Sequence, residues 1–296
     1  MIYFRYLSRK HLDVEFSLAN DLKIRIVERP GLWMSEGGLR EILAELRSVV
    51  ERCLGKAPLE YGALSGAKSS LDNAIITLLY EKSSHRPIAF NAMSILDVDV
   101  RGELIRVIHL GLTMIDPSFR RQGLSWMLYG LTCTLLLIRN RLRPLWISNV
   151  TQIPSVVGHV AESLANVFPS PDPENERTST HFALGQEIMR HHRAVFGVGD
   201  DAGFDEERFI ITNAYTGGSD NLKKNFADVP KHRNECFNAM CRNQLDYDRG
   251  DDFLQIGQFN LRVARDCLLR SAPGASLLGL AHQLASAALS PSFARH

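Results

Sequence analysis

The chain has 296 residues, of which 45% are hydrophobic, and its 34 Lys and Arg against 33 Asp and Glu give a formal net charge of +1. This balance argues against a protein that binds nucleic acid through bulk charge, because neutralising many phosphates needs an excess of cationic side chains. At roughly 150 residues per domain, the length predicts one large domain or a domain with an extension. The composition excludes a wholly disordered or collagen-like chain.

The cysteines and the apolar segments indicate where the protein works. The five cysteines include no CxxC pair, and residues 1–10 lack the apolar stretch of a signal peptide, so we expect a cytoplasmic protein. Residues 123–138 carry no charge but are too short to span a bilayer, which predicts a buried helix and no membrane span. The sequence leaves open whether the chain forms a homodimer.

The first half of the chain reads as strands with one early helix. Residues 22–27 alternate as in a strand, residues 14–18 are a candidate hairpin partner, and a helix with one apolar face begins at Ser35. Three further strands joined by short polar turns predict an antiparallel meander, at residues 73–80, 88–98 and 104–115.

A glycine-containing helix follows the meander, and residues 144–150 are again strand-like. A right-handed crossover would lay this strand parallel to the strand at 104–115. We expect a helix at 154–166, a loop at 169–180 and the last strand of the sheet at 209–211. The chain then divides into a core at 1–215 and a helical C-terminal extension at 216–296, mostly helix-compatible over 230–267, with a tail after about residue 271 that could be flexible.

The segment 115–125 carries the chemical signal. A strand ends here, a turn with Pro117 follows, and a helix begins with Gly123 and Ser125 in its first turn. Small residues let a ligand approach the backbone, and the N–H groups and dipole of a helix N-terminus suit a pyrophosphate. Arg120 and Arg121 can add charge-assisted hydrogen bonds. Taken alone, a plain helix start with solvated arginines explains the segment equally well.

This segment resembles the cofactor signature of the GNAT superfamily of acyl-CoA-dependent N-acyltransferases. In that signature a strand ends in Val-Asp-Pro, an aromatic residue follows, and then comes Arg/Gln-x-x-Gly-x-Gly/Ala. The matching positions are Ile115, Asp116, Pro117, Phe119, Arg120, Gly123 and Ser125. Ser125 stands where Gly or Ala is usual and is still small. The order of predicted elements over residues 22–211 also agrees with the family, whereas the residues after 211 are not covered.

The resemblance implies an α/β fold whose mixed, largely antiparallel, splayed sheet is flanked by helices. The sheet would open between the signature strand and the next strand, and the pantetheine arm of acetyl-CoA or another acyl-CoA would lie in the opening. The backbone of Thr113 and Ile115 would pair with the pantetheine. The pyrophosphate would be held by the amides of Arg121, Gln122, Gly123, Leu124 and Ser125.

In this family an amine attacks the thioester directly, which needs a base and an acid. The base is often a Glu on the signature strand, and this strand has none. Simple alternation places His109 on one strand face with Val107, Gly111 and Thr113, so His109 is the candidate base, with an ordinary pKa near 6.5. A structural histidine is the alternative.

The thiolate of leaving CoA is commonly protonated in the family by a Tyr on the helix after the parallel strand. Val160 stands in that place here, next to His159. His159, Tyr215 from elsewhere in the chain, or water are the alternatives for the acid. Polar residues at the end of the parallel strand could orient the acceptor, accept hydrogen bonds from the pantetheine amides or simply cap a loop: Ser148, Asn149, Thr151 and Gln152.

No metal site is expected, because the His191–His192 and Cys236–Cys241 pairs lack ligand spacing. The acidic residues between 246 and 252 lack the EF-hand pattern and are expected to be solvated. The leading hypothesis is an enzyme that moves an acyl group, most often acetyl, from CoA to an unidentified amine. The alternative is a non-catalytic acyl-CoA-binding or protein-interaction module, favoured by the missing Glu and Tyr.

Overall fold

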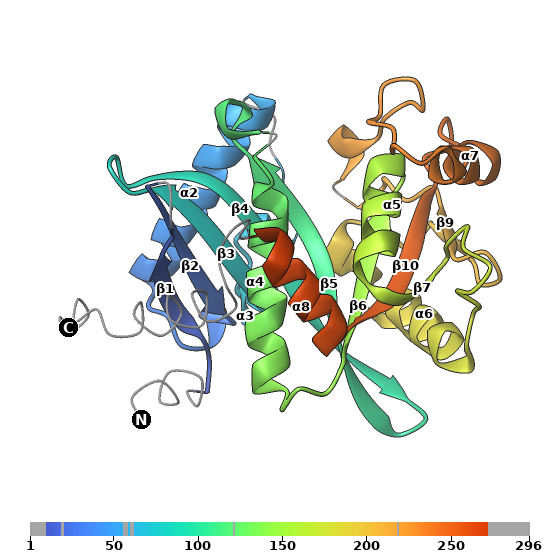
Figure 1. Cartoon of the computed structure of the whole chain (residues 1–296), viewed down its shortest axis with the longest axis horizontal. Coiled ribbons are helices and arrows are strands. Elements are labelled where there is room, and N and C mark those ends of the chain that lie inside the picture. Colours follow the sequence, from blue (N-terminus) through green and yellow to red (C-terminus); the bar gives the residue numbers. More distant parts are fainter. Residues whose placement is uncertain are drawn as a thin grey trace.

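The structure is a computed structural model that describes residues 10–18, 21–55, 59, 62–120, 122–217 and 219–271. Its strands form one sheet in the order β1-β2-β3-β4-β5-β6-β10-β9-β8, with β7 paired to β10 (Figure 1). Neighbours in this sheet are antiparallel except β5 and β6, which are parallel. The predicted fold class, a mixed and largely antiparallel sheet flanked by helices, is confirmed.

The strands of the first half follow the predicted meander. Their bounds are β1 Asp13–Ser17, β2 Leu22–Glu28, β3 Ala74–Glu81, β4 Arg86–Val100 and β5 Glu103–Ile115. β1 and β2 form the expected hairpin, with Asp21 at φ 58° before β2. The predicted parallel strand is β6, Leu145–Thr151, whose pairing with β5 is confirmed.

The helices begin where their sequences place capping groups. Ser35 accepts a hydrogen bond from the Gly38 N–H and caps α2, and Thr178 caps α6. The α-helices are α2 Glu36–Leu54, α3 Lys68–Asp72, α4 Leu124–Arg139, α5 Pro154–Ser163, α6 Ser179–His191, α7 Glu235–Gln244 and α8 Leu261–Ser271. Short 3-10 turns cover Pro30–Leu32, Gly62–Ser65, Pro117–Phe119, Arg193–Phe196 and Asp220–Leu222.

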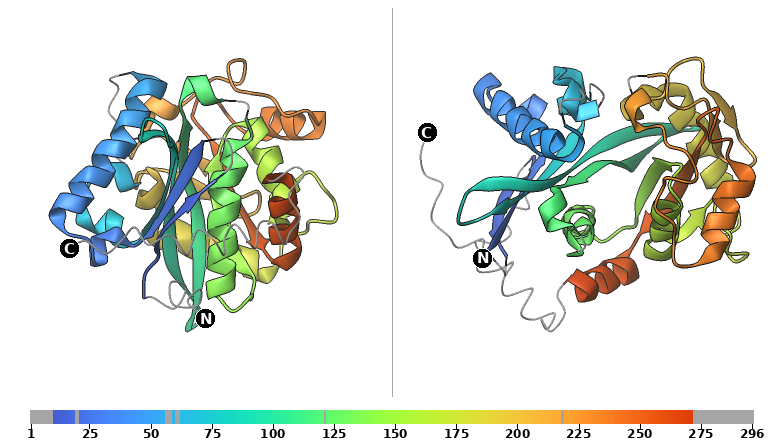
Figure 2. Two further views of the ribbon diagram at one scale, coloured as in Figure 1. Left: turned by 60° about the vertical axis from the view of Figure 1, so that its left-hand side comes forward. Right: turned by 90° about the horizontal axis from the view of Figure 1, so that it is seen from above.

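Helices cover both faces of the sheet. The right-hand view of Figure 2 shows α2 on one side of the sheet and α4 with α8 on the other. The α2 face is a core of Ile42, Leu46 and Phe90, whereas α4 contributes Leu128 and Leu135 to the core of the opposite face. Helices therefore bury both faces of the central part of the sheet.

The C-terminal part of the chain differs from its prediction. Residues 252–259 were expected to be helix-compatible and instead form β10, Asp252–Phe259, between β6 and β9 in the sheet. Phe253 packs on the α5 side, whereas Leu254 and Ile256 pack on the α6 side. A strand buried on both faces lacks a clean polar alternation, so its sequence did not indicate a strand.

Two other expectations about this half were wrong. The strand at 209–211 is found as β9, Ile210–Thr212, but it is not the last, since β10 follows it. The helix expected at 154–166 ends at Ser163, because residues 165–168 form β7, Ala165–Phe168, beside β10. β8, Gly203–Asp205, completes the edge of the sheet. The tail after residue 271 lies outside the described residues.

Candidate active site

The sheet opens between β5 and β6 at a β-bulge. Parallel pairing of the two strands stops at His109 and Ser148. On the other side of β5, Leu110 and Gly111 together stand opposite Met93 of β4. Two residues opposite one make a bulge, which bends the strand and increases its twist. We attribute the separation of β5 from β6 to this bend.

The bulge also reverses which way the side chains of β5 face. His109 stacks on Phe196 on the α6 side, and Leu112 packs into the α2 core of the same face. Thr113 instead hydrogen-bonds to Tyr129 of α4, on the opposite face. The expectation that His109 and Thr113 share a face was therefore wrong, because simple alternation does not continue through a bulge.

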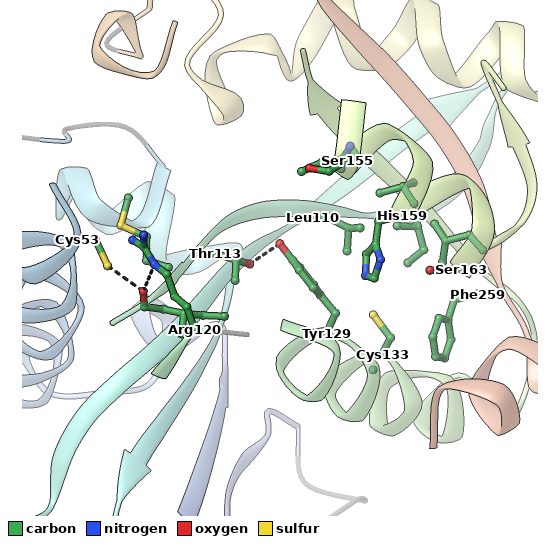
Figure 3. A pocket seen from close by; sticks show the side chains of 18 of the residues that line it. Cys53, Leu110, Thr113, Arg120, Tyr129, Cys133, Ser155, His159, Ser163 and Phe259 are labelled. Carbon is green, nitrogen blue, oxygen red and sulfur yellow. Dashed lines mark hydrogen bonds between the residues drawn. The ribbon is translucent and has the colours of Figure 1, made fainter. Parts of the chain in front are cut away.

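Two clefts meet at this opening. The larger, of about 550 Å³, lies between β5, β6, α4 and α5 (Figure 3), and the smaller, of about 310 Å³, lies toward the segments around residues 62–64, 195–196 and 214–224. Five residues line both: Leu110, Thr113, Tyr129, Asn149 and Val156. A molecule in the larger cleft can therefore be approached from the smaller one at the level of the bulge.

The signature turn stands at the mouth of the larger cleft. Asp116 accepts hydrogen bonds from the Ser118 N–H and hydroxyl and from Arg52 of α2. Burial opposes its ionisation, but these bonds and the Arg52 charge outweigh burial and hold its pKa below the usual value. Asp116 thus fixes the turn that positions the following helix and does not itself face a ligand.

The cofactor residues predicted from the signature are arranged around the start of α4. Gly123 precedes the helix at φ 71° and has no side chain to cap it, Gln122 is exposed, and Leu124 is buried in the core below. Ser125 lies in the first turn, and Arg121 lies outside the described residues. A helix start preceded by the exposed Gln122 and Gly123 matches the arrangement expected of an anion site at a helix N-terminus.

Arg120, Thr113 and Ile115 lie along one wall of the larger cleft (Figure 3). The Ile115 carbonyl accepts from Arg120 Nε at 3.2 Å and from the Cys53 thiol at 3.3 Å. An amide of a ligand that paired with this carbonyl would replace these contacts and release the Arg120 guanidinium. The Thr113 hydroxyl donates to Tyr129, whose own hydroxyl donates to the Gly111 carbonyl at 3.1 Å.

His109, the expected base, is buried and neutral. Its Nδ1 lies 3.1 Å from the Ser148 hydroxyl, and burial lowers its pKa to about 3. It lines the smaller cleft. An imidazole with so low a pKa is a weak acceptor for the proton of an ammonium group.

A different acid–base group, which sequence reasoning missed, lies in the smaller cleft. Asp252 at the start of β10 is only 4% exposed, and the Tyr215 hydroxyl donates to it at 2.9 Å. Burial raises the pKa of Asp252 to about 7, and the neighbouring Asp251 adds to the rise. Among the described residues no cationic side chain forms an ion pair with Asp252, whereas Asp251 is paired with Arg249.

The expectation that these two aspartates are solvated was wrong. Asp251 is fully buried and accepts from Arg249 Nε and Nη2, each at 2.7 Å, and from the Asp246 N–H. This pairing leaves Asp252 as the carboxyl with a raised pKa. The sequence offered one signal for this site, two acidic residues directly before an apolar run. It could not show that Tyr215 and the opening of the sheet lie beside them, because only the fold brings these parts together.

Gln152 extends the hydrogen-bonded chain beyond Tyr215. With its amide oriented to satisfy both ends, Gln152 accepts from the Tyr215 hydroxyl at 2.5 Å and donates to the Lys224 carbonyl at 2.9 Å. The Tyr215 hydroxyl therefore has two acceptors, Asp252 and Gln152, for one hydrogen. It can donate to Asp252 when that carboxyl is ionised and to Gln152 when the carboxyl is protonated.

The other predicted site residues divide between the clefts. His159 of α5 lines the larger cleft, beside Val160. Asn149 lines both clefts, and its amide lies 3.4 Å from Gln255 Oε1 of β10. Thr151 lines the smaller cleft, although its hydroxyl accepts from the Ile153 N–H. Ser148 is fully buried against His109.

The described residues were expected to hold neither a metal site nor a membrane span. They contain no group of three or more His, Cys, Asp or Glu side chains placed to hold a metal ion. Within the same residues, none of the helices combines the length and the apolar character needed to cross a bilayer.

Comparison with known proteins gives distant structural similarities only. No protein-family model matches the chain, and no curated protein matches it. A ribosomal-protein-S5-alanine acetyltransferase from Vibrio fischeri is 16% identical, with a TM-score of 0.34 over 51% of this chain and 81% of that one. A GNAT-family acetyltransferase from Streptococcus pneumoniae is 16% identical, with a TM-score of 0.30 over 48% and 82%.

An aminoglycoside N-acetyltransferase in complex with CoA is 18% identical, with a TM-score of 0.28 over 40% of this chain and 70% of that one. Similarities this low bear on neither the substrate nor the activity of the chain. The fold follows from the strand order, the bulge in β5 and the opening beside β6.

Proposed function

We propose that the protein is an acyl-CoA-dependent N-acyltransferase of the GNAT kind, in which Asp252 takes the proton from the acceptor amine. The observation that carries this proposal is a buried carboxyl with a pKa of about 7 in a cleft that adjoins the opening of the sheet. A buried carboxylate without a cationic partner costs stability, and such groups are concentrated where chemistry needs them. The cysteine pattern, with no CxxC pair, agrees with a cytoplasmic setting.

The co-substrate, acetyl-CoA or another acyl-CoA, would occupy the larger cleft. The N–H groups of residues 121–125 at the start of α4 would hold its pyrophosphate, with Arg120 adding a charge-assisted bond. The backbone of Thr113 and Ile115 would pair with the pantetheine amides. This places the thioester at the level of Leu110 and Asn149, where the two clefts join.

The amine would enter through the smaller cleft. Its ammonium form gives a proton to Asp252, and the neutral nitrogen attacks the thioester carbonyl carbon. The C–N bond forms and the C–S bond breaks; the attacking nitrogen loses a second proton as it becomes an amide, and the CoA thiolate takes up one proton in exchange. In this proposal Asp252 replaces His109 as the base, and Tyr215 positions the carboxyl. Asn149 and Thr151 would contact the acceptor from the end of β6.

We assign protonation of the thiolate to Tyr129, because its hydroxyl lies at the junction of the clefts and burial raises its pKa to about 12, which keeps it protonated. Tyr129→Phe is expected to lower kcat about fivefold, the effect of losing one hydrogen bond of about 1 kcal/mol. His159→Gln, on the cleft wall, is the comparison and should change kcat less. The opposite ranking in steady-state assays would transfer the role to His159.

Arg120→Gln is expected to weaken CoA binding by about tenfold to a hundredfold, because a charge-assisted hydrogen bond contributes about 1.5–3 kcal/mol. Isothermal titration calorimetry with CoA measures the change. Arg143→Gln, on an exposed turn before β6, is the matched control and should bind CoA as the wild type does. Equal dissociation constants for the two variants would remove Arg120 from the pyrophosphate site.

The activity itself is tested by thiol release from acyl-CoA in the presence of a panel of primary amines, together with the thermal shift caused by CoA. Release that depends on the amine supports the transferase. A thermal shift with no release across the panel supports the alternative, a non-catalytic acyl-CoA-binding module. If CoA causes no thermal shift and no thiol is released with any amine, both functions are contradicted.

A further inference from the structure

The larger cleft has two chemically different ends. Near the signature turn it is lined by Arg120 and Thr113, which offer groups suited to phosphate and amide partners. Beyond the level of the bulge it continues between α4 and α5 to a floor (Figure 3). Most of the floor residues are apolar or weakly polar, namely Cys133, Ile147, Val160, Leu164 and Phe259, and His159 and Ser163 add two polar side chains at the same end. Cys133 and Phe259 are 2% and 3% exposed, so the floor is deeply buried.

The floor is closed by the C-terminal part of the chain. Phe259 ends β10, opposite Leu145 of β6. α8 packs against α4, where a Cβ on Gly130 would lie 1.9 Å from Cys267 Sγ. Glycine at this position therefore lets α8 approach closely and seal the helix that forms one wall of the cleft. Phe259 and α8 lie beyond the residues covered by the family resemblance, whereas the other floor residues lie within them.

This floor lies farther from the signature turn than the junction of the two clefts, where the proposed function places the thioester. An acetyl group has only a methyl beyond its carbonyl and would leave the apolar floor unfilled. Apolar surface is stabilised by apolar contact, at about 0.8 kcal/mol for each buried methylene group. The lining thus matches an alkyl chain that continues past the carbonyl in the direction of the pantetheine.

We propose that the floor binds the alkyl chain of a medium-chain acyl-CoA, so that the preferred donor is longer than acetyl-CoA. This inference rests on the proposed function for the direction of the pantetheine. The alkyl chain would contact Cys133, Ile147 and Phe259, while the amine attacks the carbonyl from the smaller cleft. The reaction is unchanged: the C–N bond forms, the C–S bond breaks and the acyl chain leaves with the amine.

The dissociation constants of CoA, acetyl-CoA, butyryl-CoA, hexanoyl-CoA and octanoyl-CoA, measured by calorimetry without an acceptor, test the proposal. We expect affinity to rise by about fourfold for each methylene that enters the floor, which is 0.8 kcal/mol converted to a ratio. Hexanoyl-CoA should bind at least tenfold more tightly than acetyl-CoA. Equal or weaker binding of the longer chains overturns the inference.

A pair of variants tests where the alkyl chain of the donor lies. Cys133→Met fills the floor and is expected to reduce the ratio of hexanoyl-CoA to acetyl-CoA affinity by about tenfold, the loss of one to two buried methylenes. Cys241→Met makes the same change at a buried helical cysteine of the α7 core and should keep the wild-type ratio. Melting temperatures report whether each variant is folded. An unchanged ratio in folded Cys133→Met contradicts the placement.

If Cys133→Met does not fold, Phe259→Leu serves instead. The smaller side chain leaves more room at the floor, so the acyl-CoA that binds most tightly should have a longer acyl chain than the one preferred by the wild type. The binding series is independent of turnover, which separates this inference from the proposed function. Tight binding of long-chain donors without amine-dependent thiol release would support the floor and contradict the transferase, whereas release with acetyl-CoA as the tightest donor would do the reverse.

Discussion

Asp252→Asn is expected to lower kcat by about 10²- to 10⁴-fold, the usual contribution of a positioned general base. Asparagine keeps the shape of the side chain and can still accept the Tyr215 hydrogen bond, but it cannot take a proton. Because Asp252 lies in the smaller cleft, the dissociation constant of CoA should not change. Asp248→Asn, at an exposed position of the preceding turn, is the matched control.

The pH dependence identifies the group more specifically than the loss of rate. A base must be ionised to act, so kcat/KM of the wild type should rise with pH through about 7, the pKa of Asp252. The residual activity of Asp252→Asn should lack this step. A wild-type profile with no step near neutral pH, or a variant that keeps both the step and the rate, would contradict the assignment.

Stability should change in the opposite direction from activity. The pKa of Asp252 is raised on folding, so the folded state binds its proton more tightly than the unfolded state does. The stabilisation that this proton gives the folded state is fully present below about pH 4, the pKa of Asp252 in the unfolded chain. It is lost as the pH rises through about 7. Asp252→Asn should therefore be more stable than the wild type at pH 8, measured by urea unfolding. A purely structural aspartate would give a less stable variant.

Gly111→Ala is expected to disrupt the bulge of β5. A Cβ at this position would lie 2.0 Å from the Ala92 carbonyl oxygen of β4, a backbone atom that can move only with its strand. Overpacking of this kind costs about 1–3 kcal/mol, and occasionally more. The variant should lose at least this much stability in urea unfolding. It should also bind CoA more weakly, since the bend keeps β5 apart from β6.

Gly37→Ala provides the matched control for this substitution. Gly37 lies in the first turn of α2, where an added Cβ meets only side-chain atoms at 3.9 and 4.0 Å. Alanine at a helical position is favoured over glycine by up to about 1 kcal/mol, so this variant should be slightly more stable than the wild type. If Gly111→Ala behaved like Gly37→Ala, the bulge would not depend on glycine.

The sequence predicted those parts of the fold that depend on local pattern. The meander, the α2 cap at Ser35 and the parallel β6 all follow from periodicity, turn residues and the handedness of crossovers. β10 could not be recognised in this way, because both of its faces are buried by helices that lie far away in the chain. Its place between β6 and β9 is a property of the tertiary structure.

Prediction of the candidate site from the sequence was limited in the same way. The signature turn could be identified because its sequence pattern lies within one local segment, residues 115–125. We propose a different base from the one expected for a physical reason: His109 has a suitable pKa in water, but burial lowers it, whereas burial raises the pKa of Asp252. Neither shift can be inferred from residue type, since each depends on packing between distant segments.

The central position of β10 has a consequence for the order in which the protein can be made. β10 comes almost last in the described chain, yet it joins β6 to the β9–β8 pair. A nascent chain that has not yet reached residue 252 has an unpaired β6 edge, and unpaired edges invite aggregation. The pairing of the β6 edge, the burial of Asp252 and the closing of the floor by Phe259 therefore all wait until residues 252–259 have been made.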